Sequence, residues 1–324
     1  MKALVLQKKG EYPVYTDFDI PDEYKERERV DLLFSALNHR DLWIIKGLYA
    51  GLRYPVILGS DGYGTYKGRN VIINPGQNWG DNEAVQSKEF KILGLPDHGT
   101  FADAVYVEKK YIYDAPAHLQ PHEAAALPLA GLTAYRALFT KAGARKGQKI
   151  FISGIGGGVA LFVLLFARAM EMEIYVSSSS KEKLQKAKKL GAVDGVLYTD
   201  EDWDSKLKEM SGGVDIVIDS AGGKGFHRFL KIINPGGKIV IYGGTRGVID
   251  GISPQILFWK QITIMGTTMG SDRDFKNMLD FVNCHKITPV IDSVFSIKEF
   301  DKAIKRMESG QQFGKIVLDN KGQE

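Results

Sequence analysis

Short runs of apolar residues alternate with helical patterns from Lys149 onward. The apolar runs predict six strands: Lys149–Ser153, Glu173–Ser177, Gly195–Tyr198, Asp215–Ser220, Lys238–Gly243 and Ile262–Thr268. The segments between them predict five helices: Gly158–Met170, Lys181–Leu190, Asp202–Met210, Gly225–Ile233 and Ser253–Trp259. Regular alternation of strands and helices is typical of βαβ units. This part of the chain is therefore predicted to form a doubly wound parallel sheet.

The first 120 residues show a different pattern. Short strand-like segments are separated by glycine and proline, for example at Pro55, Gly59 and Gly62, without the alternation seen later. Such a pattern predicts a largely antiparallel barrel or sandwich. A helix near Ile297–Met307 and a strand at Lys315–Leu318 could close either part. A length of 324 residues suits two cores.

Charge and hydropathy narrow the function classes. The formal net charge is +4, and no run of five or more like charges occurs, so nucleic acid is not an expected partner. The longest apolar run, near Val159–Ala167, is shorter than the roughly 18 residues of a membrane span. The N-terminus has no signal-peptide pattern, because Lys8 and Lys9 follow a short apolar start. We therefore expect a cytoplasmic protein without a membrane partner.

Cys284 is the single cysteine of the chain. One thiol allows no internal disulfide and no multi-cysteine zinc site. The residue lies late in an amphipathic helix pattern, where we expect a small, half-buried thiol and not a nucleophile.

A glycine-rich turn connects the first predicted strand of the parallel sheet to its helix. The segment Ile150–Ser153 leads directly into Gly154-Ile155-Gly156-Gly157-Gly158-Val159-Ala160. Glycines allow the backbone to approach a pyrophosphate, and the helix N-terminus presents unpaired N–H groups. We therefore predict a Rossmann domain in which Gly156, Gly157, Gly158 and Val159 bind a nicotinamide dinucleotide.

The end of the second strand bears on the choice between the two nicotinamide dinucleotides. A carboxylate at this position accepts the ribose 2′-hydroxyl of NAD and repels a 2′-phosphate. The chain instead has four serines followed by lysines, which suits a phosphate, so Ser178, Ser179 and Lys183 are predicted to bind NADP(H). The serines also suit a turn in which Ser180 caps the next helix, and both roles are compatible.

Several segments, taken in order, carry a resemblance to a known family. They are Ser35–Asp41 (SALNHRD), Ile57–Gly62 (ILGSDG), His98–Ala102 (HGTFA), Ala126–Tyr135 (ALPLAGLTAY), the glycine turn and Gly266–Ser271 (GTTMGS). With them, nearly the whole chain resembles the medium-chain dehydrogenase/reductase superfamily, in particular its zinc-independent quinone oxidoreductase-like branch. The resemblance implies a GroES-like β-barrel substrate domain, residues 1–122 completed by 291–324, and a Rossmann domain, residues 123–290. The segment Asp61–Asn70 is shorter than the family usually shows, by about one hairpin.

The same resemblance implies further cofactor contacts and an assembly. Thr133 is expected near the nicotinamide ribose, and His39 is either a cofactor-phosphate contact or a solvated histidine. The loops and the closing strand that are expected to approach the cofactor contribute Gly243, Gly244, Thr267 and Lys315. A homodimer is expected through pairing near Lys260–Gly266.

Zinc-dependent relatives hold a catalytic metal with a cysteine, a histidine and a third group. The matching positions here are Asn38, Ser60 and Asp61, which make a poor zinc site. The structural zinc of those relatives needs four cysteines, and the matching region, residues 73–93, has none. We therefore expect no metal, with packing of residues such as Trp79, Glu89 and Phe90 in this lobe.

A reductase without a metal needs hydrogen-bond donors where negative charge develops on the substrate oxygen. Quinones and α,β-unsaturated carbonyls suit such a site, and Asn38 and Tyr49 are the candidate catalytic residues. Asn38 could instead cap a turn, Tyr49 could only line the pocket, and Asp41 is expected to hold Arg40 or local backbone.

The leading hypothesis is an NADPH-dependent reductase of a small carbonyl or quinone substrate. Two alternatives stay open: an alcohol dehydrogenase that binds metal weakly through Asp61, and a non-catalytic NADP(H)-binding redox sensor.

Overall fold

The computed structural model describes residues 1–322, which form two compact units. Unit 1 comprises Met1–Leu132 and the chain from Gly270 onward, and unit 2 comprises Thr133–Met269. These limits differ from 122/123 and 290/291, because two helices near the crossover points pack within unit 1. Helix α3 (Pro121–Ala126) packs on strands of that unit, and helix α10 (Asp272–His285) places Phe275 against Tyr113, with 4.8 Å between ring centroids.

Unit 2 contains one six-stranded parallel sheet in the order β13-β12-β11-β14-β15-β16. Its strands are β11 (Lys149–Ile152), β12 (Glu173–Ser178), β13 (Asp194–Leu197), β14 (Val214–Asp219), β15 (Ile233–Ile241) and β16 (Thr263–Gly266). Its helices are α5 (Gly158–Ala169), α6 (Lys181–Lys189), α7 (Trp203–Ser211), α8 (Phe229–Ile232) and α9 (Pro254–Lys260), with 3-10 turn η3 (Phe226–Arg228) before α8 and a π-helical turn η2 (Arg136–Lys141). The predicted Rossmann fold and its six strands are confirmed.

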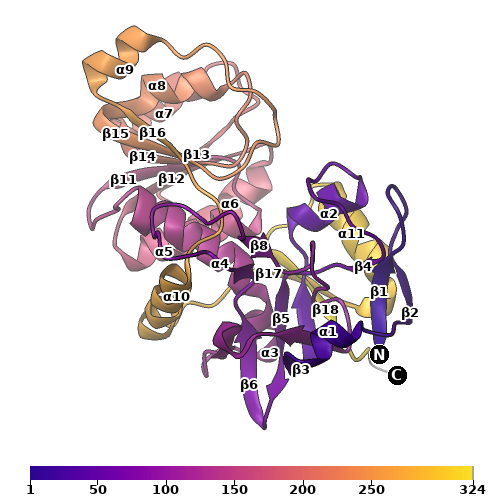
Figure 1. Ribbon diagram of the computed structural model, residues 1–324. Helices are drawn as coiled ribbons and strands as arrows, with labels where there is room; N and C mark the ends of the chain where they lie inside the picture. The colour runs from indigo at the N-terminus through magenta and orange to yellow at the C-terminus, as the bar shows by residue number, and fades with distance from the viewer. Residues whose placement is uncertain (323–324) are drawn as a thin grey trace. The chain divides into compact units, whose positions relative to one another are not determined.

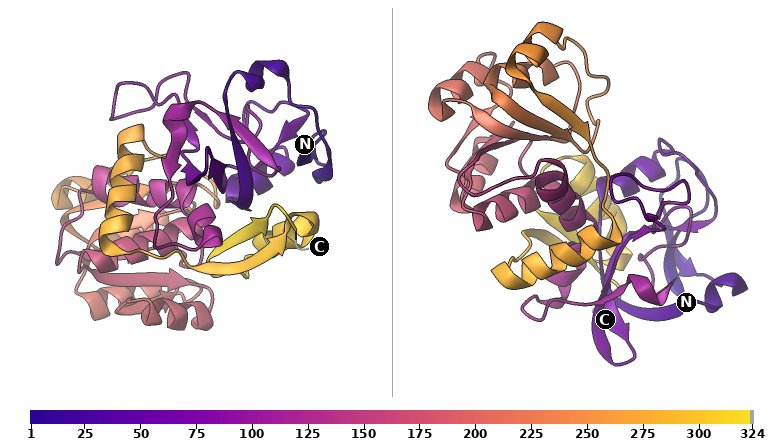
Figure 2. Two further views of the ribbon diagram at one scale, coloured as in Figure 1. Left: turned by 90° about the horizontal axis from the view of Figure 1, so that it is seen from below. Right: turned by 60° about the vertical axis from the view of Figure 1, so that its left-hand side comes forward.

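Helices cover both faces of this sheet, as Figures 1 and 2 show: α5 and α6 lie on one face and α7, α8 and α9 on the other. On the second face, Phe151 of β11 stacks on Trp203 of α7, with ring centroids 5.8 Å apart. Buried side chains from α8 and the neighbouring strands complete that core. Helix α5 is buried over most of its surface, as its nearly continuous apolar sequence predicts.

Unit 1 is mainly antiparallel and forms the GroES-like domain. Its large sheet has the order β10-β6-β5-β3-β18-β17, with β9 also paired to β3, and a smaller sheet has the order β2-β1-β4. The strands are β1 (Lys2–Leu6), β2 (Val14–Asp17), β3 (Glu28–Ala36), β4 (Val56–Ile57), β5 (Asp61–Tyr66), β6 (Arg69–Ile73), β7 (Gly76–Gln77), β8 (Lys91–Ile92), β9 (Ala104–Val107), β10 (Ile112–Asp114), β17 (Ile291–Ser296) and β18 (Lys315–Asp319). The helices are α1 (Asp22–Lys25), α2 (His39–Ile45), α3, α10 and α11 (Phe300–Glu308), with 3-10 turns η1 (Lys109–Tyr111) and η4 (Ile297–Glu299), and α4 (Pro128–Tyr135) spans the limit between the units.

The end of the chain closes unit 1, and this decides the question that the sequence left open. Strand β18 lies between β3 and β17, and Val317 pairs with Ala36. Helix α11 packs its apolar face, including Ile304, into the core that contains β1 and β4. A lysine at the start of β18 is thereby brought to the beginning of β5.

Trp79 and Phe90 pack against each other in the lobe that carries zinc in metal-dependent relatives. Trp79 is 2% exposed and its ring meets Phe90 edge-on, with 5.2 Å between centroids. The backbone N–H of Ser87 donates to the carbonyl oxygen of Trp79 at 2.6 Å. Packing by Trp79 and Phe90 is therefore confirmed, whereas Glu89 is exposed.

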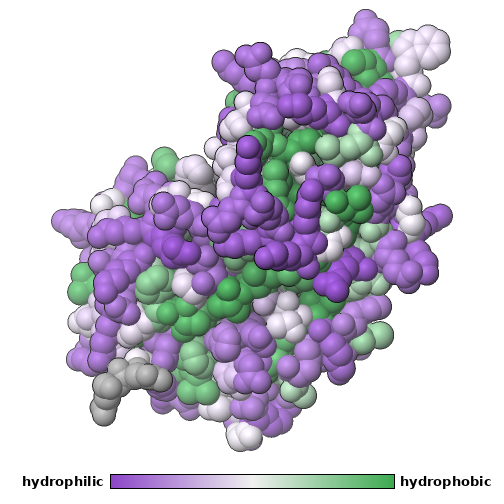
Figure 3. Space-filling model, turned by 180° about the vertical axis from the view of Figure 1, so that it is seen from behind, coloured by the Kyte–Doolittle hydropathy of each residue, from purple (hydrophilic) through white to green (hydrophobic). Residues whose placement is uncertain are grey.

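Most of the face drawn in Figure 3 is hydrophilic, with apolar side chains confined to limited areas. No helix among residues 1–322 has the length and apolar character needed to cross a membrane. The prediction that Cys284 is half-buried is wrong, because α10 turns this thiol toward solvent.

Candidate active site

The glycine turn of unit 2 adopts a backbone that only glycine accepts easily. Gly154 and Gly156 have φ values of +68° and +130°, and Gly157 is the N-cap of α5. The next strand holds the turn, because Ser177 accepts the N–H of Gly154 on its hydroxyl at 3.1 Å and the N–H of Ile155 on its carbonyl at 2.7 Å. The turn is therefore fixed before any ligand binds.

The turn lies where the strand order of the sheet reverses. Strands β11 and β14 are neighbours, and the carboxyl ends of strands at such a switch point are the usual ligand-binding edge of an open α/β sheet. Buried Asp219 joins the two ends, accepting from the Ser153 hydroxyl and from the N–H of Gly222 at 2.7 Å. The role of Asp219 could not be predicted from the sequence, because its partner Ser153 lies 66 residues away and the pair leaves no local pattern.

The same edge of unit 2 offers space and an unpaired polar atom. A Cβ atom built on Gly157 or Gly244 meets nothing within 4 Å. By contrast, a Cβ on Gly243 comes 2.6 Å from the carbonyl oxygen of Ser220, so this glycine serves strand packing. The hydroxyl of Thr267 is buried without a hydrogen-bond partner among the described residues. These features fit a dinucleotide, with Gly157 and Gly244 leaving room and Thr267 presenting a polar atom.

The serines after β12 hold local backbone. Ser178 is 2% exposed and accepts the N–H of Ser180 at 3.2 Å, and Ser180 is the N-cap of α6, accepting the N–H of Lys183 at 3.3 Å. A hydroxyl that accepts one bond keeps its own hydrogen to donate. Ser179 is exposed and has no side-chain hydrogen bond within the described part of the chain. The predicted N-cap at Ser180 is confirmed.

Arg246 lies in the loop after β15 and extends over the Tyr198 ring, with its guanidinium carbon 4.7 Å from the ring centroid. The backbone N–H of Tyr198 donates to the carbonyl oxygen of Ser178 at 3.0 Å. The guanidinium of Arg246 thus lies over Tyr198, which is hydrogen-bonded to Ser178.

In unit 1, a buried lysine joins Asn38 and Asp61. The Lys315 ammonium donates to the Asn38 side-chain oxygen at 2.7 Å, to the Leu37 carbonyl at 2.7 Å and to Asp61 Oδ2 at 2.9 Å. The Lys315 side chain is 4% exposed and that of Asp61 is 0% exposed. The structure therefore places Lys315, which was expected to approach the cofactor, inside a closed polar network of unit 1.

Asp61 accepts two further hydrogen bonds. Its Oδ2 accepts from Asn38 Nδ2 at 2.9 Å, and its Oδ1 accepts the backbone N–H of Leu129, near the start of α4, at 2.7 Å. The N-terminus of a helix favours a carboxylate. The Asp61 carboxylate therefore balances the charge of the Lys315 ammonium and orients the side-chain amide of Asn38.

Asn38 is also the N-cap of α2, so its expected capping position and its place in the cluster coexist. Its backbone N–H donates at 2.8 Å to buried Asp41, which holds local backbone as expected. Burial raises the pKa of Asp41 to about 6, although the charge of Arg40 and the bond from Asn38 lower it. These observations support the expected structural role of Asp41 and do not assign it a role as a catalytic base.

Arg40 connects Ser60 to Tyr49. Its Nη1 atom donates to the Ser60 hydroxyl at 2.7 Å and to the Leu93 carbonyl at 2.8 Å, and its guanidinium lies 5.2 Å from the centroid of the Tyr49 ring. Arg40 is 8% exposed. Tyr49 thus packs against a buried cation.

Two further residues that were predicted to contact the cofactor are His39, in unit 1, and Thr133, in unit 2. His39 is exposed at the start of α2, and its pKa is lowered by partial desolvation and by the positive charge of Lys315. Thr133 is buried in unit 2, with its hydroxyl 4.0 Å from the sulfur of Met269.

The three positions that match zinc ligands do not fit zinc. Asn38 and Asp61 direct oxygen atoms at an ammonium group, and Ser60 faces a guanidinium. Among residues 1–322, no group of three histidine, cysteine or acidic side chains could hold a metal ion. The side chains that match zinc ligands are therefore bound to two cations of the protein, Lys315 and Arg40.

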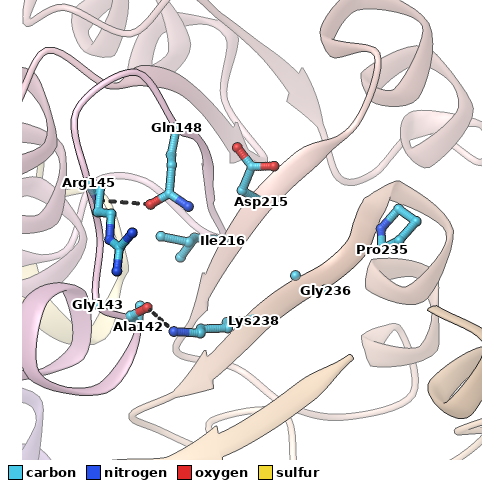
Figure 4. A pocket seen from close by; sticks show the side chains of 10 residues that line it. Ala142, Gly143, Arg145, Gln148, Asp215, Ile216, Pro235, Gly236 and Lys238 are labelled. Carbon is cyan, nitrogen blue, oxygen red and sulfur yellow. Dashed lines mark hydrogen bonds between the residues drawn. The ribbon is translucent and has the colours of Figure 1, made fainter. Parts of the chain in front are cut away.

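A separate hollow of about 240 Å³ lies at the amino ends of the strands of unit 2 (Figure 4). Two of its charged groups are engaged within the protein: Lys238 donates to the carbonyl of Ala142 at 2.8 Å, and Asp215 accepts the N–H of Lys149 at 2.9 Å. It lies at the opposite end of the strands from the glycine turn.

A Rossmann unit with an open glycine turn and a GroES-like unit with a buried polar cluster define a nicotinamide-dependent oxidoreductase. A family model described as "Zinc-binding dehydrogenase" matches residues 158–283. The chain belongs to the medium-chain dehydrogenase/reductase superfamily, which includes quinone oxidoreductase-like members.

Three proteins are similar to this chain over most of its length. A "Zinc-type alcohol dehydrogenase-like protein YogA" of Leptosphaeria maculans is 38% identical, covering 90% of this chain and 89% of the relative. A solved NAD-dependent alcohol dehydrogenase is 31% identical, covers 98% of this chain and 99% of its own, and superposes with a TM-score of 0.92. The quinone oxidoreductase of Thermus thermophilus, solved also with NADPH, is 26% identical with a TM-score of 0.82, covering 98% of this chain and 100% of its own.

Proposed function

We propose that the protein is an NADPH-dependent reductase of quinones or α,β-unsaturated carbonyls that works without a catalytic metal. The observation that carries this proposal is the Lys315–Asp61–Asn38 cluster, because an ammonium group occupies the oxygens of two residues that match zinc ligands of metal-dependent relatives. A reduced nicotinamide supplies the hydride, and water supplies the proton that completes the reduction. Conjugated acceptors suit such a site because their developing charge is delocalised onto an oxygen that a neutral donor can stabilise.

Asn38 is the proposed donor to that oxygen. Its Nδ2 atom carries two hydrogens, and one of them donates to Asp61. The second has no acceptor among residues 1–322. Tyr49 is the second candidate, and its contact with Arg40 favours a role in lining the site.

A substrate panel tests the reaction. Purified protein is incubated with NADPH and a quinone, an enone, a saturated ketone or an aldehyde, with and without a strong chelator, and NADP⁺ is incubated with primary and secondary alcohols. We expect oxidation of NADPH by the quinone or the enone at a rate that the chelator leaves unchanged. Alcohol turnover that is lost with chelator would instead support a weakly metal-dependent alcohol dehydrogenase, and tight NADPH binding without turnover would support a redox sensor.

NADP(H) is preferred over NAD(H) in this proposal because no carboxylate follows β12 and hydroxyl donors stand there. The glycine turn and Val159 are proposed for the pyrophosphate, with Ser178, Ser179 and Lys183 at the 2′-phosphate. The variant Ser179→Asp places a negative charge at the exposed position of this turn. We expect its affinity for NADPH to fall at least tenfold while its affinity for NADH changes little, measured by cofactor fluorescence. Equal binding of NADPH and NADH by the wild type would contradict the preference.

The remaining contacts are proposed from family resemblance: Thr133 at the nicotinamide ribose, Gly243, Gly244 and Thr267 along the cofactor groove, and His39 at a cofactor phosphate. Thr267→Val removes the unpaired hydroxyl with little change of volume. A weaker affinity for NADPH in this variant supports the assignment, and unchanged affinity removes Thr267 from the site.

A homodimer formed through the edge of the parallel sheet is also proposed. Among residues 1–322, strand β16 pairs only with β15, and Phe258 and Trp259 of the adjacent α9 are 60% and 78% exposed. An unpaired edge beside exposed aromatic side chains suits pairing with a second copy. Light scattering should give twice the chain mass for the wild type and a smaller mass for Trp259→Glu, whereas Val193→Glu, at an exposed position elsewhere in unit 2, should leave the mass unchanged.

A further inference from the structure

We infer that Lys315 is a positioning residue for catalysis: it fixes the side-chain amide of Asn38 so that an N–H, and not the amide oxygen, is left to face the substrate. The inference rests on the proposed reductase function and deepens it. It assigns to Lys315 a role that differs from the cofactor contact implied by family resemblance.

The direction of an asparagine amide is a chemical choice. An amide can offer either its oxygen or its NH₂ group to a ligand, and the two orientations differ by a half-turn about the last side-chain bond. A developing oxyanion is stabilised only by the NH₂ orientation, and it is repelled by the oxygen. A neutral asparagine in the place of a metal ligand therefore needs something that holds it in one orientation.

Lys315 and Asp61 together supply this hold. The ammonium can only donate, so it pairs with the amide oxygen at 2.7 Å, and the carboxylate can only accept, so it pairs with Nδ2 at 2.9 Å. In the flipped amide, NH₂ would face the ammonium and oxygen would face the carboxylate. Both contacts would then be repulsive in a region where the Lys315 side chain is 4% exposed and water cannot screen them.

The ammonium is itself fully used. Its three N–H bonds match its three acceptors, which are the Leu37 carbonyl, Asn38 Oδ1 and Asp61 Oδ2. Lys315 cannot donate to a substrate without losing one of these bonds. It therefore acts through Asn38, which at 7% is the most exposed residue of the Lys315–Asp61–Asn38 cluster.

A double-mutant cycle tests the inference. Lys315→Met removes the charge and keeps most of the side-chain length, and Asn38→Ala removes the proposed donor. We expect each single variant to lower kcat about a hundredfold, as loss of an oxyanion donor does. We expect the double variant to be no slower than Asn38→Ala, because a positioning residue has nothing to position once the amide is gone.

Three controls keep the outcome interpretable. The affinity for NADPH, measured by fluorescence titration, should change less than about twofold in Lys315→Met, since the ammonium does not face the cofactor in this proposal. Asp61→Asn/Lys315→Met leaves no unpaired buried charge, so it provides a folded variant that lacks the hold if Lys315→Met alone does not fold. Lys302→Met removes an exposed lysine of α11 that pairs with Glu299, and it should behave like the wild type.

An activity-independent measurement separates this inference from the proposed function. In protein labelled with ¹⁵N-asparagine, the side-chain amide signals of Asn38 are identified by their loss in Asn38→Ala. We expect Lys315→Met to shift these signals and to merge or broaden them as the amide begins to flip. If the wild type reduces no acceptor but the signals respond in this way, the proposed function fails and the hold on Asn38 stands.

Two results would overturn the inference. The first is a set of effects that multiply in the double variant, which would mean that Lys315 acts independently of Asn38. The second is a large loss of NADPH affinity in Lys315→Met with kcat unchanged and the Asn38 signals unmoved, which would return Lys315 to a cofactor contact.

Discussion

The buried carboxyl group of Asp41 makes the stability of unit 1 depend on pH. Asp41 is 0% exposed, and its Oδ1 has no hydrogen-bond partner in the described part of the chain. Burial raises its pKa from 3.8 to about 6, which is about 2 units. Each unit corresponds to about 1.4 kcal/mol, so keeping this group ionised in the folded protein costs up to about 3 kcal/mol.

Proton linkage determines how this pKa shift changes the stability of the protein with pH. Because the folded pKa is above the unfolded value, the folded state binds more protons between about pH 4 and about pH 6. The contribution of Asp41 to stability is therefore fully present below about pH 4 and is lost as the pH rises through about 6. The variant Asp41→Asn cannot titrate, so the free energy of unfolding of the wild type minus that of the variant should fall by up to about 3 kcal/mol across this window.

Urea unfolding at several pH values measures this difference. Tryptophan fluorescence reports the transition, and Trp43 lies in the same helix as Asp41. The difference between the two proteins cancels the other titrating groups. A flat profile for Asp41→Asn would refute the reasoning, because it would mean that the Asp41 pKa is the same in the folded and unfolded states.

Three further predictions concern stability and cofactor binding. Asp204 is buried, and although desolvation raises its pKa, the interactions with Arg228 and Lys231 outweigh this effect and lower the pKa to about 2. Asp204→Asn should therefore destabilise unit 2 by up to about 2 kcal/mol at pH 7, and this loss should shrink as the pH falls from about 4 to 2. Unfolding curves that differ equally at pH 7 and pH 3 would contradict this. Trp79→Ala should cost unit 1 about 3 to 5 kcal/mol by opening a cavity in its lobe, and Trp79→Phe clearly less, as measured by urea unfolding; equal losses argue against packing as the cause. Gly243→Ala should weaken NADPH binding, because its Cβ meets a backbone oxygen at 2.6 Å and the strand end must move, and a wild-type Kd from fluorescence titration would disprove this.

Local patterns were sufficient for much of the fold. The alternation of apolar runs and helices after Lys149 predicted all six strands of the parallel sheet, and the ends differ by a few residues except at β15, where the strand begins at Ile233 instead of Lys238. The segment Ile233–Gly237 contains proline and glycines, which made it resemble a turn. Such differences arise because pairing with β14 extends a strand beyond what its own residues favour.

The glycine turn and the helix cap at Ser180 were also predictable, because each depends on residues close together in the sequence. Cys284 was placed incorrectly because an amphipathic pattern gives the buried face of α10 only approximately. One step around the helix separates a half-buried thiol from an exposed one.

The partners of the polar residues were decided by the tertiary structure. The sequence showed that Asn38, Ser60 and Asp61 stand at the positions that match zinc ligands. Lys315, however, lies 254 residues from Asp61, and its long side chain can reach in several directions. Only the insertion of β18 between β3 and β17 brings its ammonium to this carboxylate. The sequence alone therefore determined which groups are available for chemistry. The packing of distant strands decided which of them share a hydrogen bond, because a hydrogen bond requires a distance of about 3 Å that no sequence spacing specifies.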